Sequence, residues 1–264
     1  MWKKVSFGIF IAFCLAGGIY WFAYIREVKT PVNDAMSAIP LNATIVIESR
    51  QSAVAWKKLS QTNIMWEELL GTEVITKIDL QGNYLDSLFM LHPSVSPLLE
   101  GHPVIISLHP GKNETTELLY LYSLPNLTHH EELEELILSA NNGRTPLTRN
   151  FEGQDILTIR PEGRSDFHYC LSKGILIMSS SSILLESAIR QASAPQSLLS
   201  DTNFLKIRDA AGKKVDATIY VNYKYLSALV NPLLNPRGKA WINELSTFAE
   251  HSGWDVTIRP NALL

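Results

Sequence analysis

The sequence predicts an α+β protein in which an N-terminal transmembrane helix precedes antiparallel sheet with segregated helices. Three observations predict this class. Residues 5–25 carry no charged side chain, four short extended segments follow one another between residues 149 and 178, and the hexapeptide at 42–47 is echoed at 216–221. Antiparallel strands between blocks of helices are typical of α+β folds rather than doubly wound sheets. The echo predicts a first repeat and part of a second.

The N-terminal run is long enough to cross a bilayer. At about 1.5 Å per residue, a helix over residues 5–25 would extend roughly 31 Å, the thickness of the hydrocarbon core. Trp2 precedes the run, and Tyr20, Trp21 and Tyr24 lie at its end, where aromatic rings favour the headgroup level. We therefore expect residues 1–29 to form a single-pass signal anchor whose partner is the lipid bilayer.

The flanking charges favour a cytoplasmic N-terminus, although the bias is small. Lys3 and Lys4 precede the run, whereas Arg26 and Lys29 follow it, and positive residues prefer the cytoplasmic side. This orientation predicts a protein of the inner (cytoplasmic) membrane with its C-terminal domain in the periplasm or outside the cell.

Two other interpretations of the same run are less favoured. The apolar core of a cleaved signal peptide spans about 7–15 residues and ends at small residues, but residues 19–25 continue the apolar run after Ala16-Gly17-Gly18. A lipoprotein needs small residues before its modified cysteine, whereas Phe13 directly precedes Cys14.

Composition limits the partners and the compartment. The chain has 23 basic and 26 acidic residues. Removing residues 1–34, which hold four basic and two acidic residues, leaves 19 basic and 24 acidic ones. This mildly acidic balance argues against nucleic acid as a partner. Cys170 is the only cysteine beyond the predicted span, so no disulfide within the domain is expected.

The first half of the chain alternates helices with strands. Residues 30–41 contain two prolines and are expected to link the anchor to an α+β domain at 42–214. A β-branched run predicts a buried strand at 44–47, and apolar spacing predicts helices at 52–70 and 72–90. The next expected elements are strands at 104–108 and 118–124, joined by a turn at Pro110-Gly111-Lys112-Asn113, and a helix at 128–141.

The second half begins with a meander. Short extended segments are predicted at 149–151, 156–160, 167–171 and 175–178, separated by glycine-containing turns. Helices are expected at 183–192 and 202–211. Residues 215–264 would start the second repeat, with a strand at 216–221, helices around Leu226 and at 241–248, a strand at 254–258 and the beginning of its partner at 262–264. The hairpin would be incomplete, which predicts that the repeat continues beyond this chain.

Several of these segments resemble an uncharacterised family of membrane-anchored envelope proteins of Bacteroidota-type bacteria. The resemblance is carried by the Ile39–Thr44 opening, the helices containing Trp56 and Trp66, and the Gly174–Ile177 strand leading into Ser182–Glu186, together with the Trp254–Leu264 hairpin. It covers most of residues 38–264. It implies an anchor and an exported domain with no assigned activity, and it carries over no functional residues.

Motifs for the common enzyme classes are missing. The sequence contains no G-x-S-x-G, no H-E-x-x-H, no G-x-x-x-x-G-K-[ST] and no G-x-G-x-x-G, so no catalytic, cofactor-binding or metal residue is predicted. In His129-His130-Glu131-Glu132, only His129 and Glu132 could share an ion, and acidic residues in a first helical turn are explained by the helix dipole.

Other polar and aromatic residues are also expected to be structural. His102 and His109 flank one strand about 23 Å apart when extended, so they do not converge locally. A hydroxyl in 179–182 should cap a helix, and Cys170 should be a buried thiol in a strand. Trp56 and Trp66 should pack in the core. An exposed aromatic patch for a partner is the alternative, and a helix break at Thr62-Asn63 would argue against that patch.

Two functions from different classes follow. The favoured one is a membrane-tethered envelope protein that binds or scaffolds another protein or a cell-surface polymer without catalysis. The alternative is an exported hydrolase or metal-dependent enzyme whose residues meet only in the fold, which predicts a polar cleft with at least three convergent titratable groups.

Overall fold

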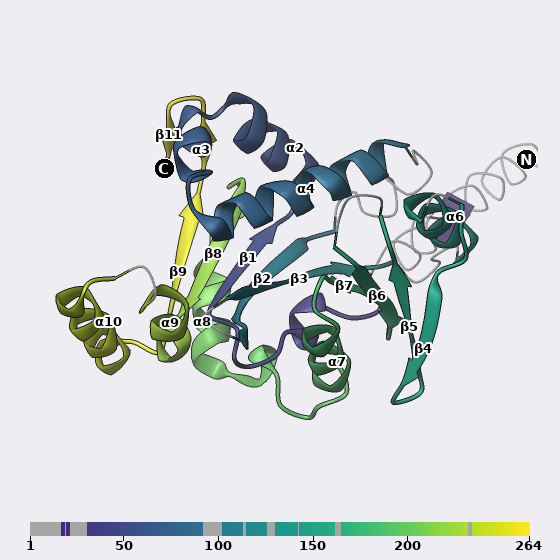
Figure 1. Ribbon diagram of the computed structural model, residues 1–264. Helices are drawn as coiled ribbons and strands as arrows, with labels where there is room; N and C mark the ends of the chain where they lie inside the picture. Colours follow the sequence, from purple (N-terminus) through teal and green to yellow (C-terminus); the bar gives the residue numbers. More distant parts are fainter. Residues whose placement is uncertain are drawn as a thin grey trace, which may run out of the picture.

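The computed structural model describes residues 17, 18, 20, 21, 31–91, 102–112, 115–125, 130–141, 143–161, 165–231 and 234–264. These residues form a nine-stranded sheet in the order β4-β5-β6-β7-β3-β2-β1-β8-β9, and every neighbouring pair is antiparallel. Helices cover both faces (Figure 1). The predicted α+β class with antiparallel sheet and several helices is confirmed.

The central strands are apolar on both faces because both faces are covered. β1 (Ile45–Ser49) lies between β2 (Val104–Pro110) and β8 (Ala217–Asn222). β3 (Thr116–Ser123) pairs with β2 on the other side, and seven of its eight residues are buried. A strand buried on both faces should read as a continuous apolar run, as Leu118–Tyr122 does.

The predicted meander is present. It consists of β4 (Leu147–Phe151), β5 (Gln154–Ile159), β6 (Phe167–Ser172) and β7 (Ile175–Ser179). Two of its turns are two-residue turns with positive φ throughout, at Glu152-Gly153 and Lys173-Gly174. Turns of this hand match the twist of the adjoining strands. β7 then returns to pair with β3, so the meander extends the central strands.

One face of the sheet is covered by helices from the first half of the chain. α4 (Glu73–Leu91) and α6 (His130–Ala140) contribute Ile78, Leu85, Leu88 and Leu136 to this core. The predicted helix 52–70 is wrong as a single element. It is divided into α2 (Ser52–Lys57), a π-helical turn (Lys58–Thr62) and α3 (Ile64–Leu69), because Asn63 leaves the helical region and caps α3.

The opposite face is covered by α7 (Ser182–Gln191), α8 (Thr202–Ala210) and two short 3₁₀ turns, Ala35–Ala38 and Leu198–Ser200. Residues 30–41 were expected to be a linker, but Ala35, Met36, Ala38 and Ile39 are fully buried in this core. Ala35 N donates to Ser123 Oγ at 2.9 Å. The residues just before β1 are therefore part of the folded domain.

The last part of the chain completes one end of the sheet. After β8 come α9 (Tyr223–Val230), α10 (Pro236–Phe248) and β9 (His251–Val256). β9 starts three residues before the predicted strand 254–258. The prediction that residues 262–264 pair with this strand holds only at its end, because β11 (Ala262–Leu263) pairs with β10 (Ile258–Arg259) in a separate two-stranded sheet.

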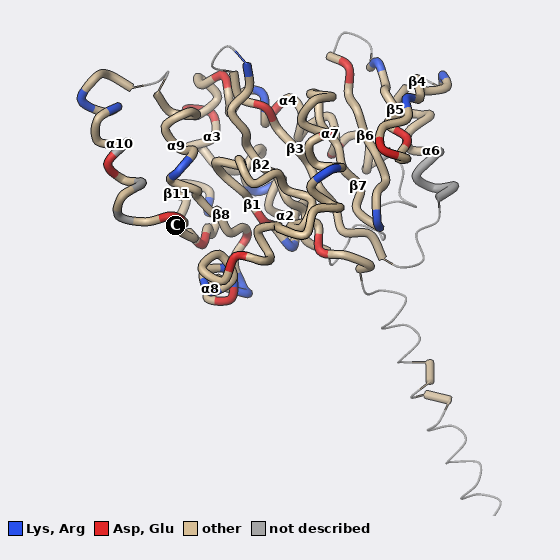
Figure 2. Tube along the Cα trace, turned by 90° about the horizontal axis from the view of Figure 1, so that it is seen from below, with Lys and Arg blue, Asp and Glu red and all other residues tan. Residues whose placement is uncertain are grey.

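Within the described residues, no helix has the length and apolar character needed to cross a bilayer. The predicted span 5–25 lies outside the described residues except for positions 17, 18, 20 and 21. Over the described elements, acidic and basic side chains are scattered, and α8 carries both signs (Figure 2).

Candidate functional site

The candidate site lies at the β9 end of the sheet, where one strand edge is open. Among the described strands, β9 pairs only with β8. Its residues Gly253, Trp254 and Asp255 are exposed, and the Trp254 side chain is 60% exposed. An edge strand presents unpaired backbone donors and acceptors, which makes it a template for another strand.

The backbone hydrogen bonds show which β9 groups face outward. Asn222 N donates to Thr44 O at 2.8 Å, and Tyr223 N donates to Glu250 O at 3.0 Å. Because successive residues of an antiparallel strand bond to opposite sides, the even-numbered residues of β9 bond to β8. The backbone groups of residues 251, 253 and 255 therefore point away from β8, toward the open edge.

The two faces of β9 differ in chemistry. A Cβ built on Gly253 would lie 2.7 Å from Ile207 of α8, so residues 251, 253 and 255 turn their side-chain positions toward the α8 face. Trp254 lies on the other face and opposite Ile219, which is opposite Ile47 of β1. This row continues the apolar face toward the sheet edge, and Trp254 is its exposed end.

The register between β1 and β8 relates the two segments of the sequence echo. Val46 lies opposite Tyr220, and these residues hold the fifth position of the hexapeptides 42–47 and 216–221. Ile45 lies opposite Val221 and Ile47 lies opposite Ile219. A two-fold axis through the Val46 and Tyr220 pair would exchange these two flanking pairs.

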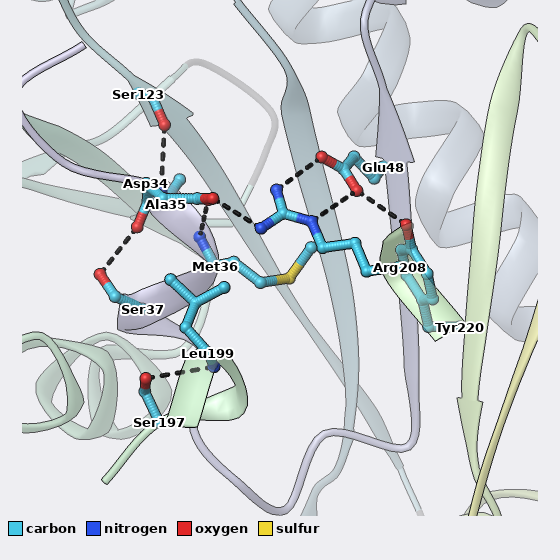
Figure 3. A network of polar contacts seen from close by, with 10 residues as sticks. All are labelled: Asp34, Ala35, Met36, Ser37, Glu48, Ser123, Ser197, Leu199, Arg208 and Tyr220. Atoms are coloured by element: carbon cyan, nitrogen blue, oxygen red, sulfur yellow. Dashed lines mark hydrogen bonds and ion pairs between the residues drawn. The ribbon is translucent and has the colours of Figure 1, made fainter. Parts of the chain in front are cut away.

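A buried ion-pair network lies beside this end of the sheet (Figure 3). Arg208 of α8 donates from Nη1 to Asp34 Oδ2 at 2.6 Å and from Nη2 to Glu48 Oε1 at 2.8 Å. Tyr220 OH donates to Glu48 Oε2 at 2.9 Å. The network therefore ties the segment before β1 to α8 and to the paired strands β1 and β8.

The pKa shifts follow from this burial and pairing. Burial alone would lower the pKa of Arg208, but its hydrogen bonds to Glu48 and Asp34 raise it above the ordinary value. Burial and the Glu48 carboxylate both raise the pKa of Tyr220. Arg208 is therefore held as a cation between the two acidic side chains.

A small cavity adjoins the network. It has a volume of about 30 Å³ and is lined by Glu48, Arg50, Arg208, Lys213 and Tyr220, with neighbouring residues of β8 and the α8–β8 turn. Such a volume holds one or two waters, whereas sites for small organic ligands measure about 300–1,000 Å³. The network is best explained as structural.

The serines and the cysteine singled out in the sequence are structural, as predicted. Ser181 caps α7 by accepting from Leu184 N at 3.3 Å, and Ser179 Oγ donates to Leu118 O at 2.7 Å. Cys170 is fully buried in β6, and burial raises the pKa of its thiol to about 11. A protonated buried thiol is a poor nucleophile.

The structure also places the predicted aromatic and histidine candidates. Trp56 and Trp66 lie on different helices and pack edge to face, with ring centroids 5.7 Å apart. His109 is buried, with its ring nitrogens 2.9 Å from Ser107 Oγ and 3.1 Å from Asn42 Oδ1. The His129–Glu132 motif stays a prediction, because His129 and the side chains of residues 130–132 lie outside the described parts.

Sequence reasoning missed the features that mark the β9 end. Trp254 was assigned to a strand but not to an open edge, and Asp201, Glu250 and His251 were not associated, although the fold brings their ligand atoms within 4.8 Å of one another. Asp201, Glu250 and His251 meet because α8, which begins after Asp201, packs against β9. The echo at 216–221 was a sequence signal only for the relation between β1 and β8.

A scan against protein-family models finds no match to this chain, and searches of curated proteins and of solved structures find none either. The function is therefore argued from the geometry of the β9 end.

Proposed function

We propose that this protein is a membrane-tethered envelope protein that binds a protein partner along the open edge of β9 and acts as a scaffold rather than an enzyme. Residues 5–25 would anchor it in the inner membrane, with residues 31–264 in the periplasm or outside the cell. The uncharged 21-residue run and the resemblance to anchored envelope proteins support the tether.

The observation that carries the proposal is the register of β1 against β8. In each half of the chain, a strand is followed by helices and then by a second strand antiparallel to the first, giving β1 with β2 and β8 with β9. Helices of both halves, α4 and α9, contribute to the same core, since Ile78 and Leu229 share one cluster. These features support a second repeat at 215–264, related to the first by a two-fold axis.

The repeat identifies what the β9 edge should bind. Val46 lies opposite Ser107 of β2, and the equivalent Tyr220 lies opposite Gly253 of β9, so β9 corresponds to β2. The outer side of β2 is covered by the antiparallel strand β3. By the same relation, the occupant of the β9 edge is an antiparallel strand with apolar side chains like those of β3.

The exposure of Trp254 supports the same occupant. Trp254 lies opposite Ile219, and Ile219 corresponds to Ile45, which lies opposite Leu108. Leu108 is 4% exposed, whereas Trp254 is 60% exposed. A strand added beside β9 would cover the indole as β3 covers Leu108. Main-chain hydrogen bonds would supply affinity, and the side chains on the Trp254 face would supply specificity.

Site-specific photo-cross-linking of the full chain in intact cells tests this proposal. A benzophenone amino acid at position 254 is expected to cross-link an envelope protein, and the adduct should map to one extended segment of that partner. The matched control is position 241 on α10, because Trp241 is 61% exposed and Trp254 is 60% exposed. Position 241 should give no such adduct.

A charge variant tests whether the edge itself is responsible. Lysine on an edge strand opposes strand pairing, so Trp254→Lys should abolish co-purification of the cross-linked partner, whereas Trp241→Lys should leave it unchanged. Adducts of equal yield from both positions would contradict the proposal. An adduct joining two copies of this chain would replace the partner with a homodimer.

A further inference from the structure

His251 is a buried histidine whose two ring nitrogens have no hydrogen-bond partner among the described residues. Its side chain is 6% exposed, and its ring packs edge to face on Phe204 of α8, with centroids 5.8 Å apart. Leaving a buried polar group without a partner costs about 1–3 kcal/mol. An unpaired imidazole in this position therefore calls for a partner, either a bound ion or a water.

Two carboxylates face this imidazole. Asp201 Oδ2 lies 4.0 Å from His251 Nδ1, while Asp201 Oδ1 accepts from the N–H groups of Asn203 and Phe204 at 2.8 and 3.2 Å. Glu250 is held at its backbone, where its carbonyl accepts from Tyr223 N. One ligand atom from each residue lies within 4.8 Å of the others.

We propose that Asp201, Glu250 and His251 bind one divalent transition-metal cation of the Zn²⁺ class. Imidazole nitrogen with carboxylate oxygen suits such ions, at bond lengths of about 2.0–2.2 Å. Bonds of this length bring ligand atoms to roughly 3.0–3.6 Å from one another. The ligand atoms are now up to 4.8 Å apart, and rotation of the exposed Glu250 side chain would shorten its distances to the other two. Water would complete the coordination.

The local charges favour a cation despite the helix terminus. The N-terminus of α8 carries a partial positive charge of about half a unit, but its first amides are already bonded to Asp201 Oδ1. The remaining Asp201 oxygen and the Glu250 carboxyl group place two acidic side chains beside one imidazole. A bound ion would join the start of α8 to the first residue of β9.

Water is the competing explanation for the unpaired imidazole. A cavity of about 10 Å³ beside His251 is lined by Thr44, Phe204 and Asn222, among other residues, and this is close to the minimum volume for one water. A water there would satisfy a ring nitrogen without either carboxylate. The two explanations therefore differ in whether Asp201 and Glu250 are needed.

Titration of the metal-free full chain with Zn²⁺ distinguishes a metal site from a bound water. One Zn²⁺ per chain should bind with a rise in Tm, and Asp201→Asn and Glu250→Gln should each weaken binding by about tenfold or more. Asparagine preserves the helix cap, and Glu250 is exposed, so both variants should fold. Glu244→Gln on α10 is the matched control and should bind as the unmodified chain does.

Co²⁺ provides a spectroscopic measurement of the same site. Its visible absorption should appear with the unmodified chain and the Glu244→Gln variant, and should be lost in the two ligand variants. Equal Zn²⁺ affinity in all four proteins, or no saturable binding, would overturn the proposal. Displacement of Zn²⁺ by equimolar Mg²⁺ would overturn the assigned class of metal. The result is independent of strand binding, because Trp254 lies on the other face of β9.

Discussion

Arg208 is the only cation that pairs with Asp34 and Glu48 among the ion pairs of the described residues. Arg208→Met keeps most of the side-chain volume but leaves Glu48, whose side chain is 6% exposed, as a buried charge without its cation. Breaking such a pair costs about 3–5 kcal/mol, so we expect the free energy of unfolding, measured with urea, to fall by about 3 kcal/mol.

The control for this variant is Arg190→Met. Arg190 pairs with Glu152, but both side chains are more than half exposed, and pairs of this kind contribute about 0–1 kcal/mol. If Arg208→Met costs no more than Arg190→Met, the buried network does not stabilise the domain.

His109 should make stability depend on pH. Burial lowers its pKa from 6.5 to about 4, so the unfolded chain takes up the proton first as the pH falls. Its contribution to the free energy of unfolding is therefore complete above pH 6.5 and is lost between pH 6.5 and 4, by about 3 kcal/mol.

Urea unfolding of His109→Gln over the same pH range tests this dependence. Glutamine can hydrogen-bond but does not titrate there, so the variant should show a shallower slope between pH 6.5 and 4 than the unmodified chain. The same slope in both proteins would mean that His109 is not the responsible group.

At the scale of elements, the turn between β6 and β7 holds the segment that precedes the 3₁₀ turn at Ala35–Ala38. Gly174 has φ of +75°, and an added Cβ would lie 2.7 Å from Val32 Cβ. Gly153 has nearly the same φ, +77°, but an added Cβ would meet nothing within 4 Å. The two glycines therefore share the backbone requirement and differ only in this contact.

Alanine at each position measures that difference. Positive φ alone makes Gly153→Ala cost about 1 kcal/mol, whereas Gly174→Ala should cost about 1–3 kcal/mol more, because the added methyl overpacks the contact with Val32. Thermal unfolding of the two variants gives the comparison. Equal losses of stability would show that residues 31–33 do not pack against this turn.

Much of the element list could be predicted from local signals. The meander at 147–179 is marked by glycine turns, and the helix at 73–91 by apolar spacing, because both depend on neighbours in the chain. The break at Asn63 and the burial of Ala35–Ile39 could not be predicted, since they depend on contacts with segments far away, such as the bond from Ala35 to Ser123. Local patterns do not contain those contacts.

At the scale of the whole molecule, the sheet order depends on one long-range pairing. β1 and β8 are separated by more than 160 residues, yet they are neighbours in the sheet and would lie at the centre of the proposed two-fold repeat. The echo at 42–47 and 216–221 indicated the relation, but not that its two segments pair with each other. The open edge at Trp254 depends on β9 pairing only with β8 among the described strands, and the Asp201, Glu250 and His251 group depends on α8 packing against β9. Neither arrangement could be found from spacing in the sequence.

Thiol labelling in intact cells tests the central claim, an exported domain whose β9 edge is occupied by a partner. Single cysteines replace Trp254 or Trp241 in a background carrying Cys14→Ala and Cys170→Ala, and a small membrane-impermeant maleimide is added before or after purification. We predict that Trp241→Cys is labelled in intact cells, whereas Trp254→Cys is protected there and labelled once purified. Equal labelling of both in intact cells would contradict occupancy of the edge, and no labelling of either until lysis would contradict export.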